Sequence, residues 1–456
     1  MPFSKEPESR IPALFTDLYE ITMAAAYWDN SIDSTATFNL FFRTLPTHRN
    51  YFIVCGIEKA LDYILHLDFN RHEINYIQNL EIFKNVSQFF FDYLSILRFK
   101  GTVRAVPEGT FVFPNEPVME ITAPIIEAQI IETALLSLIN FETMVASKAS
   151  RIVRASGEKS IVEFGSRRAH GPGAAVAGAR AAYIGGCEGT SNLEAGMLYN
   201  IPVFGTIAHS FIMAHDDEST AYENFAKTFP DHVILLIDTY DTLNGAKLAA
   251  KLGDRVKGVR IDSGDLLSLS REVRKILDSA GLKNTQIMAS GDLNEDKIRS
   301  LINDGAPIDS FGVGSELITS KDAPTMSGVY KLVETMEQGQ THFRIKLSKD
   351  KSTLPGRKQV YRLHDENGMF MKDIIAADGE LDDKPEFTPL MKTYIKDGEL
   401  IEKMPDLEAI RGQVQSSLKC FSEQLLNPSI DTIYPVELSD QMRKMQKQAK
   451  LEHQKD

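Results

Sequence analysis

VILLIDTYDTLNGAKLAAKLGDRVKGVRIDSGDL, residues 233–266, contains two apolar runs, each followed at once by acidic and polar residues. The runs at 233–237 and 258–261 have the length and composition of buried strands, and 242–252 between them has a helical pattern. Strands joined through a helix are parallel, because a parallel connection needs a crossover. The stretch therefore predicts part of a parallel sheet.

The same order of elements continues on both sides of this stretch. Further apolar runs lie at 161–164, 202–204, 286–289 and 310–312, and further helical patterns at 266–278 and 294–303. All six predicted strands lead into polar, glycine-rich or ionisable sequence: FGSRRAHGPG, GTIAHSF, DTYD, DSGD, SGDL and GVGSE. A barrel gathers all its strand ends on one face, whereas an open doubly wound sheet binds ligands mainly at one switch point. The pattern therefore favours an α/β barrel.

The two ends of the chain have a different pattern, that of an antiparallel α+β unit. Residues 34–43 alternate apolar and polar, which predicts a half-buried strand with Phe41 as the exception. Other predicted strands lie at 103–106, 110–113, 118–121, 330–334, 343–347 and 359–363, with helices at 56–67 and 87–97 and a solvated helix at 441–456. We expect the C-terminal strands to complete the N-terminal sheet. The expected domains are 1–125 (an α+β sandwich domain), 126–329 (the catalytic barrel) and 330–456 (completing the sandwich).

The composition excludes several classes of protein. The chain has 456 residues, is 43% hydrophobic and 25% charged, and carries a formal net charge of −13, which argues against general binding of nucleic acid or anionic membranes. Three cysteines without paired spacing exclude a disulfide framework and a cysteine-based zinc site. The most apolar stretch, 125–145, is interrupted by Glu127, Glu132 and Glu142 and predicts a buried helix. With a polar N-terminus that lacks a signal-peptide pattern, these features predict a soluble cytoplasmic protein.

Two glycine-rich loops are candidates for phosphate binding. Gly291 lies in SGD and Gly312 and Gly314 lie in GVGS, and each loop follows a predicted strand. Glycine lets backbone N–H groups approach an anion closely, and a following helix N-terminus favours negative charge. Ordinary strand-to-helix turns explain these loops equally well.

Acidic residues at the strand ends are the second candidate group. Carboxylates gathered there can hold ribose hydroxyls or a magnesium ion, but aspartate is also a favoured helix N-cap. Asp241 and Asp265 fit the capping explanation better. Asp238, Asp262 and Asp292 lie at or just beyond the ends of their strands, and we expect them to serve function.

Arginine, phenylalanine and histidine complete the candidate site. Arg167, with its neighbour Arg168, offers a planar fork for a carboxylate or phosphate, and Phe164 can stack on a flat ring. His209 follows the strand at 202–204, and a neutral histidine is a base or nucleophile when a carboxylate such as Asp238 orients its ring. A structural histidine is an equally good interpretation at this point.

Eight segments in order resemble the nicotinate phosphoribosyltransferase family over nearly the whole chain. They are FTDLYEITMAAAY (15–27), EFGSRRAHGPGAAVAGARAAYIGGCEGTSNLEAG (163–196), GTIAHSF (205–211), DTYDT (238–242), RIDSGDL (260–266), SGDL (290–293), FGVGSEL (311–317) and LPGRKQVYR (354–362). The resemblance implies a type II phosphoribosyltransferase fold, with an irregular α/β barrel and a sandwich domain from both chain ends. It also implies a homodimer with shared active sites that joins nicotinate to phosphoribosyl pyrophosphate, with Mg²⁺ and with ATP as co-substrate.

The resemblance also implies roles for individual residues. Phe164 and the partner subunit's Tyr19 would enclose the pyridine ring, and Arg167 would face its carboxylate. Asp262 and Asp292 would hold ribose or the magnesium-bound pyrophosphate, and Gly291, Gly312 and Gly314 would line the 5′-phosphate site. His209 matches the family's phosphorylated histidine, with Asp238 as its partner, and Arg260 and Ser191 join the substrate-binding set.

Two other functions compete with this interpretation. The related nicotinamide phosphoribosyltransferases have an acidic residue where this chain has Ser191, and a carboxylate there would repel nicotinate. A non-catalytic sensor of pyridines or phosphoribosyl compounds would not need the activatable His209. Both features favour an enzyme that uses the acid.

Overall fold

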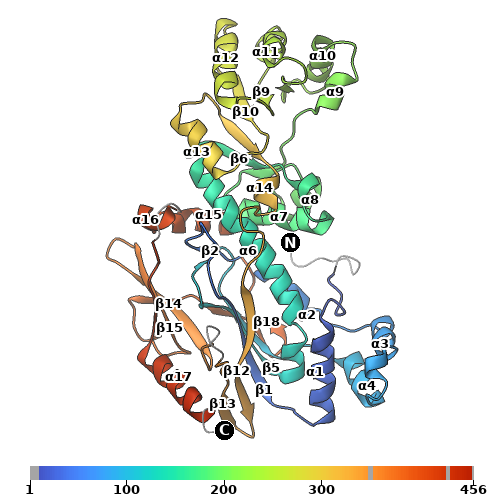
Figure 1. Cartoon of the computed structure of the whole chain (residues 1–456), viewed down its shortest axis with the longest axis vertical. Helices are drawn as coiled ribbons and strands as arrows, with labels where there is room; N and C mark the ends of the chain where they lie inside the picture. Colours follow the sequence, from blue (N-terminus) through green and yellow to red (C-terminus); the bar gives the residue numbers. More distant parts are fainter. Residues whose placement is uncertain (1–9, 348–352, 428–431, 454–456) are drawn as a thin grey trace. The chain divides into compact units, whose positions relative to one another are not determined.

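The computed structural model describes residues 10–347, 353–427 and 432–453, and the chain forms two compact units (Figure 1). One unit consists of Met1–Met144 with Thr325–Asp456, and the other of Val145–Pro324. The sequence placed these boundaries at 125/126 and 329/330. The first observed boundary lies inside helix α6 (Glu132–Ala155), which belongs partly to each unit.

The first unit contains a seven-stranded sheet with the order β13-β12-β1-β5-β3-β17-β18. Its strands are β1 (Thr35–Phe42), β3 (Thr102–Ala105), β5 (Pro117–Pro124), β12 (Gly328–Glu337), β13 (Gln340–Phe343), β17 (Lys392–Lys396) and β18 (Glu399–Leu400). β1 lies between β5 and β12 and is antiparallel to both, and β17 pairs with β3. The prediction that C-terminal strands complete the N-terminal sheet is confirmed for 330–334, which lies in β12. The strand expected at 343–347 is instead β13, and the strand expected at 359–363 belongs to a separate sheet.

Strand β1 is buried on both faces, so the prediction of a half-buried strand is wrong. Its polar side chains are paired across the sheet instead of facing solvent. The Asn39 amide donates to Glu120 Oε2 at 3.0 Å, and the Thr37 and Thr122 hydroxyls lie 3.0 Å apart. A polar side chain can be buried at small cost when a neighbouring strand supplies its hydrogen-bond partner.

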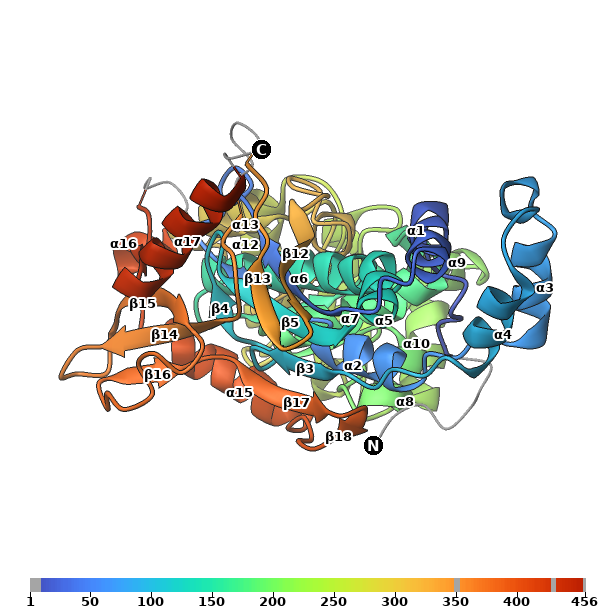
Figure 2. The same ribbon diagram turned by 90° about the horizontal axis from the view of Figure 1, so that it is seen from below.

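A second, four-stranded sheet in this unit has the order β16-β14-β15-β19. Its strands are β14 (Lys358–His364), β15 (Phe370–Ala377), β16 (Phe387–Pro389) and β19 (Val436–Leu438). The C-terminal helix α17 (Asp440–His453) lies along β15, as both views show (Figures 1 and 2). Met442 and Ala449 of this helix are fully buried. The expected terminal helix is present, but one of its faces packs on the protein.

The remaining elements of this unit are short. They are a two-stranded antiparallel sheet of β2 (Phe52–Ile53) with β4 (Phe111–Val112), and helices α1 (Leu18–Asp29), α2 (Ile57–Leu65), α3 (Arg71–Gln78), α4 (Gln88–Ile96), α5 (Ile125–Gln129), α15 (Leu407–Leu418) and α16 (Glu423–Leu426). The predicted helices at 56–67 and 87–97 correspond to α2 and α4.

One helical stretch, Ile125–Ala155, is long and apolar enough to cross a membrane by length and composition alone. Within the protein, 67% of its most apolar window is buried, which is typical of a core helix. Its acidic residues have partners: Glu127 accepts a 2.7 Å hydrogen bond from the Lys100 amide, and Glu142 pairs with Lys59 at 2.9 Å. The prediction of a buried helix agrees with this structure.

Two buried carboxyl groups of the first unit, those of Glu116 and Asp373, share one arginine, Arg362. Arg362 Nε donates to Asp373 Oδ1 at 2.9 Å, and the Tyr434 hydroxyl donates to the same oxygen at 3.1 Å. Glu116 accepts a hydrogen bond of 2.8 Å from the Phe113 amide. Burial, and next the charge of Asp373, raise the pKa of Glu116 well above its usual value. Glu116 therefore keeps its proton to a higher pH in the folded protein than in the unfolded chain.

We expect this proton to make stability fall with rising pH. A carboxyl whose folded-state pKa is raised contributes its full stability below the unfolded-state pKa and loses it as pH rises through the folded-state pKa. Glu116→Gln, which keeps a neutral side chain, should reduce the loss of stability that begins above the ordinary glutamate pKa of 4.5, by up to about 1.4 kcal/mol per pH unit. Urea unfolding across a pH series measures this, with the exposed Glu386→Gln as control. Identical pH slopes in wild type and Glu116→Gln would contradict it.

The second unit contains a six-stranded parallel sheet with the order β7-β6-β11-β10-β9-β8. Its strands are β6 (Ser160–Glu163), β7 (Gly189–Thr190), β8 (Ile234–Leu236), β9 (Gly258–Ile261), β10 (Gln286–Ala289) and β11 (Ser310–Val313). Its helices are α7 (Pro172–Ile184), α8 (Leu193–Tyr199), α9 (His209–Met213), α10 (Glu218–Thr228), α11 (Thr242–Ala250), α12 (Leu266–Ser279), α13 (Glu295–Asn303) and α14 (Ser315–Ile318). Five predicted strands and the three predicted helices are present.

The sixth predicted strand, at 202–204, is reduced to a single parallel bridge between Thr190 and Val203. Within the described residues, β7 and β8 at the two ends of the strand order do not pair with each other. The expected parallel α/β architecture is thus confirmed in an irregular form that does not close into a complete barrel.

Candidate active site

The carboxyl ends of the parallel strands bring most of the predicted site residues to one edge of the sheet. Asp238 follows β8, Asp262 follows β9, Gly291 follows β10 and Gly314 follows β11. The loop that begins at Phe164 follows β6, which pairs with β11. Neighbouring parallel strands end side by side, so residues separated by up to 150 positions share this edge.

Asp262 lies at the centre of this group. Its Oδ1 accepts a short hydrogen bond from the Ser290 hydroxyl and lies 3.8 Å from Arg260 Nη2. Its Oδ2 lies 3.9 Å from His209 Nε2, and its backbone amide donates to Asp238 Oδ2 at 3.0 Å. Through its carboxylate and its backbone amide, Asp262 therefore connects the ends of three strands with the histidine.

His209 is the first residue of α9, and its ring is partly exposed. Its Nδ1 lies 3.1 Å from the hydroxyl of Thr239. Asp238, the predicted partner of the ring, makes other contacts in this structure: its Oδ2 accepts hydrogen bonds from the Asp262 amide and from the Ser263 hydroxyl at 2.6 Å. Asp238 thus holds the neighbouring loop, and the adjacent Thr239 contacts the histidine.

Two arginines add positive charge to an edge that also carries several aspartates. Arg260 is 12% exposed and donates to the Thr206 hydroxyl at 2.5 Å. Burial lowers the pKa of Arg260. The charges of Asp262 and Asp238 raise it, and the charge of Arg167 lowers it further. Arg167 therefore lies near enough to Arg260 for the two charges to repel. This arrangement favours an anionic ligand.

The glycines are required by close contacts. Gly291 has φ of 95°, and a Cβ there would lie 2.0 Å from the Asp262 carbonyl oxygen. A Cβ on Gly312 would lie 2.5 Å from the ring of Phe164, so Gly312 makes room for this aromatic side chain. Gly314 precedes α14, and a Cβ there would lie 3.3 Å from the Phe164 carbonyl oxygen. The predicted phosphate-binding role of all three glycines stays a prediction.

The aspartates divide as the sequence suggested. Asp241 caps α11 by accepting the Asn244 amide at 2.7 Å, and Asp265 caps α12. Asp292 caps no helix, since α13 is capped by Asn294. Asp292 has φ of 45°, an uncommon backbone conformation for a residue other than glycine, and its side chain is exposed. Ser191 is exposed as well, directly after β7.

Tyr19 lies in α1, in the other compact unit, and is 46% exposed. Burial, and next the charge of Glu132, raise the pKa of its hydroxyl to about 12. Its neighbour Glu20 is fully buried and accepts a 3.0 Å hydrogen bond from the Thr133 amide. Glu20 therefore fixes the start of α1, which carries Tyr19, against α6.

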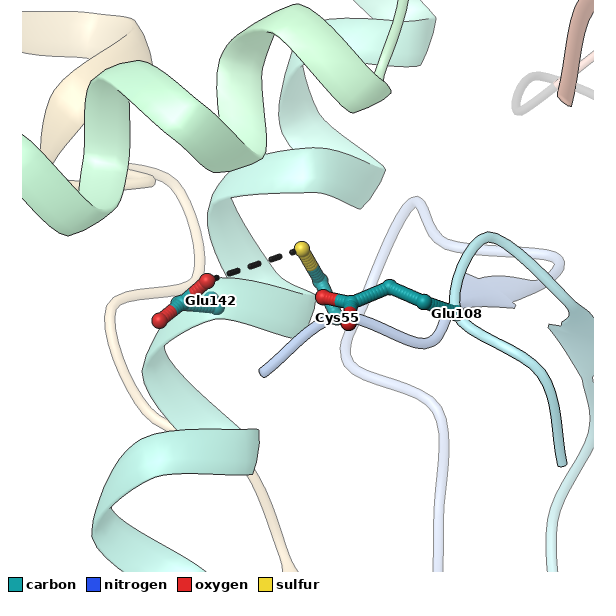
Figure 3. Close-up of side chains that lie close together, drawn as sticks. All are labelled: Cys55, Glu108 and Glu142. Carbon is teal, nitrogen blue, oxygen red and sulfur yellow. Dashed lines mark hydrogen bonds between the residues drawn. The ribbon is translucent and has the colours of Figure 1, made fainter. Parts of the chain in front are cut away.

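A buried cluster outside this edge contains Cys55, Glu108 and Glu142, whose ligand atoms lie within 4.8 Å of one another (Figure 3). Glu108 accepts the Gly56 and Glu58 amides at 2.7 and 3.0 Å, and Lys59 neutralises Glu142. These contacts make Glu108 the cap of α2. The cluster is explained by these structural roles.

A parallel α/β sheet that does not close completely, with glycine loops, carboxylates and arginines at its strand ends, and an antiparallel domain from both chain ends are the architecture of a type II phosphoribosyltransferase. Three family models match: the nicotinate phosphoribosyltransferase N-terminal domain at residues 14–140, the nicotinate phosphoribosyltransferase family at 159–374, and the nicotinate phosphoribosyltransferase C-terminal domain at 381–446. The chain belongs to the nicotinate phosphoribosyltransferase family.

Individual relatives agree with this assignment. A nicotinate phosphoribosyltransferase of Mycobacterium tuberculosis is 42% identical over 441 residues, covering 95% of this chain and 92% of its own. That of Bacillus subtilis is 41% identical over 459 residues, covering 94% and 93%. The crystal structure of human nicotinic acid phosphoribosyltransferase superimposes with a TM-score of 0.84 at 27% identity, covering 95% of this chain and 99% of that one.

Proposed function

We propose that this chain joins nicotinate to 5-phosphoribosyl 1-pyrophosphate, giving nicotinate mononucleotide and pyrophosphate in NAD salvage, and couples this reaction to ATP hydrolysis. The observation that carries the proposal is the grouping of Asp262 with Arg260 and His209 at the strand ends. Family membership supports the two main substrates.

Nicotinate would bind between the loop after β6 and the loop after β7. The Phe164 ring, supported on Gly312, would stack on the pyridine, and Arg167 would pair with its carboxylate. Ser191 on the opposite loop adds no negative charge that would repel the acid. The partner subunit's Tyr19 would cover the second face of the ring, which requires a homodimer.

The sugar phosphate would bind at the aspartates and glycine loops. Asp262 and Asp292 would hold the ribose or the pyrophosphate, and Gly291, Gly312 and Gly314 would line the 5′-phosphate site. The carboxylates also suit Mg²⁺, which prefers oxygen ligands. Among the described residues, Asp238 Oδ1 is buried and accepts no hydrogen bond, as an oxygen reserved for a cation would. When bound there, Mg²⁺ would neutralise charge on the pyrophosphate.

ATP would phosphorylate His209 at Nε2, the nitrogen that faces Asp262. With Nδ1–H donating to Thr239, the Nε2 lone pair is available. The bond from Nε2 to the γ-phosphorus forms as the bond to the ADP oxygen breaks, and later hydrolysis returns the histidine and phosphate. The whole process would take place in the cytoplasm.

The discriminating experiment is pyrophosphate release with nicotinate or nicotinamide, each with and without ATP. Release with nicotinate that rises when ATP is added supports the proposal. A preference for nicotinamide would favour the related nicotinamide phosphoribosyltransferase activity. Binding of nicotinate without any turnover would indicate a sensor.

A further inference from the structure

Glu163, the last residue of β6, is a carboxylate with 0% exposure that the reaction above does not use. Its Oε2 accepts a 2.6 Å hydrogen bond from the Thr190 hydroxyl, and its Oε1 accepts a short one from the Gly165 amide. Its backbone carbonyl accepts the Ser191 amide at 2.9 Å. One residue therefore joins the loop after β6 to the loop after β7.

These contacts continue into a closed ring of hydrogen bonds. The Asn192 amide donates to the Thr190 hydroxyl at 3.0 Å, and the Asn192 side chain donates to the Ser166 hydroxyl at 3.0 Å. Ser166 follows Gly165, which brings the ring back to Glu163. Asn192 also caps α8 by accepting the Ala195 amide at 2.9 Å. Every member has defined partners, so the ring holds the two loops in one arrangement.

We propose that Glu163 is a positioning residue that sets the spacing between Arg167 and Ser191, and through it the preference for nicotinate over nicotinamide. Arg167 directly follows Ser166, and Ser191 lies between Thr190 and Asn192, so both project from the ring. The inference rests on the proposed function, because it assumes that these two loops hold the pyridine substituent.

The chemistry of the site requires a carboxylate at this position. Two donors, the Gly165 N–H and the Thr190 O–H, point at the two oxygens of Glu163, and the Thr190 oxygen already accepts from Asn192. A glutamine would present an NH₂ group to one of these donors and would leave one hydrogen bond unmade. A buried hydrogen bond lost in this way shifts the loops without emptying space in the core.

The test compares Glu163→Gln with Glu188→Gln, an exposed glutamate that precedes β7. We expect Glu163→Gln to raise the KM for nicotinate about tenfold, with kcat and the KM for phosphoribosyl pyrophosphate nearly unchanged. The ratio of kcat/KM for nicotinate to that for nicotinamide should fall by a similar factor. Glu188→Gln should behave as wild type.

A second variant covers the case in which Glu163→Gln folds poorly. Thr190→Val keeps the side-chain shape and removes the same hydrogen bond from the other side, together with the bond that Thr190 accepts from the Asn192 amide, so it should give at least the same selective loss. The double variant should be no worse than the single ones, because both break one ring.

Three outcomes would overturn the proposal. Lower thermal stability with equal changes in both KM values would show a merely structural role. A discrimination ratio equal to that of Glu188→Gln, in an enzyme that uses nicotinate, would refute this inference alone. A wild-type chain that does not use nicotinate would overturn the proposed function and this inference together.

Discussion

Arg167→Ala is expected to lower kcat/KM for nicotinate by a factor of tens to thousands, which corresponds to a loss of about 2–5 kcal/mol of binding free energy. The side chain lies on an exposed turn (Ser166–Arg168), and none of the ion pairs among the described residues involves it. Its charge nevertheless lowers the pKa of the buried Arg260, which places Arg167 near the strand-end site. An arginine held beside the site without an internal partner is available for a substrate carboxylate.

The adjacent Arg168 is the matched control, because it is equally exposed and has the same charge and length. Arg168→Ala should change nicotinate kinetics little, and neither variant should change the midpoint of thermal unfolding appreciably. Steady-state kinetics with nicotinate and nicotinamide measure the effect. If both alanine variants lose activity equally, the loop carries a general positive charge and Arg167 has no specific role.

The positions of the strands could be predicted well where an apolar run is bounded by polar residues. β9 and β10 occupy the residues expected for them, 258–261 and 286–289. β7 could not be predicted, since it is two residues long and begins with Gly189, whose absent Cβ lets the Pro202 carbonyl oxygen approach. The failure at β1 has another cause: alternation shows which residues share a face, but it does not show that a second layer covers the polar face.

The site could be predicted as a set of residues but not as a set of contacts. Strand ends in parallel units converge, so the sequence could group Asp238, Asp262 and His209. The partner of each side chain depends on the strand order, and in this order β8 lies next to β9. Asp238 therefore reaches the loop after β9, and the histidine meets Thr239. Glu163 had no distinguishing signal in the sequence, because a lone glutamate at a strand end resembles any surface acid.

His209→Ala is expected to abolish ATP hydrolysis and the stimulation of nicotinate turnover by ATP, while slow ATP-independent transfer remains. The transfer chemistry would depend on Arg167, Asp262 and the glycine loops, and all of these are intact in the variant. The geometry assigns the orienting role to Thr239, whose hydroxyl lies 3.1 Å from Nδ1, in place of Asp238. Thr239→Val should therefore lower the rate of phosphorylation about tenfold, the effect of one lost hydrogen bond, without removing the acceptor.

Incubation with γ-labelled ATP, followed by acid or base treatment and peptide mapping, tests this directly. A phosphorylated imidazole loses its label in acid and keeps it in base, in contrast to a phosphorylated hydroxyl. The label should map to the peptide containing His209, and the exposed His232→Ala variant should incorporate as much as wild type. Asp238→Asn adds a second discrimination: because Asp238 holds the Asp262 amide and the Ser263 hydroxyl, it should disturb substrate binding more than phosphorylation. Acid-stable label, or label on a peptide without His209, would rule out the phosphohistidine. A larger decrease in the rate of phosphorylation in Asp238→Asn than in Thr239→Val would return the orienting role to the aspartate.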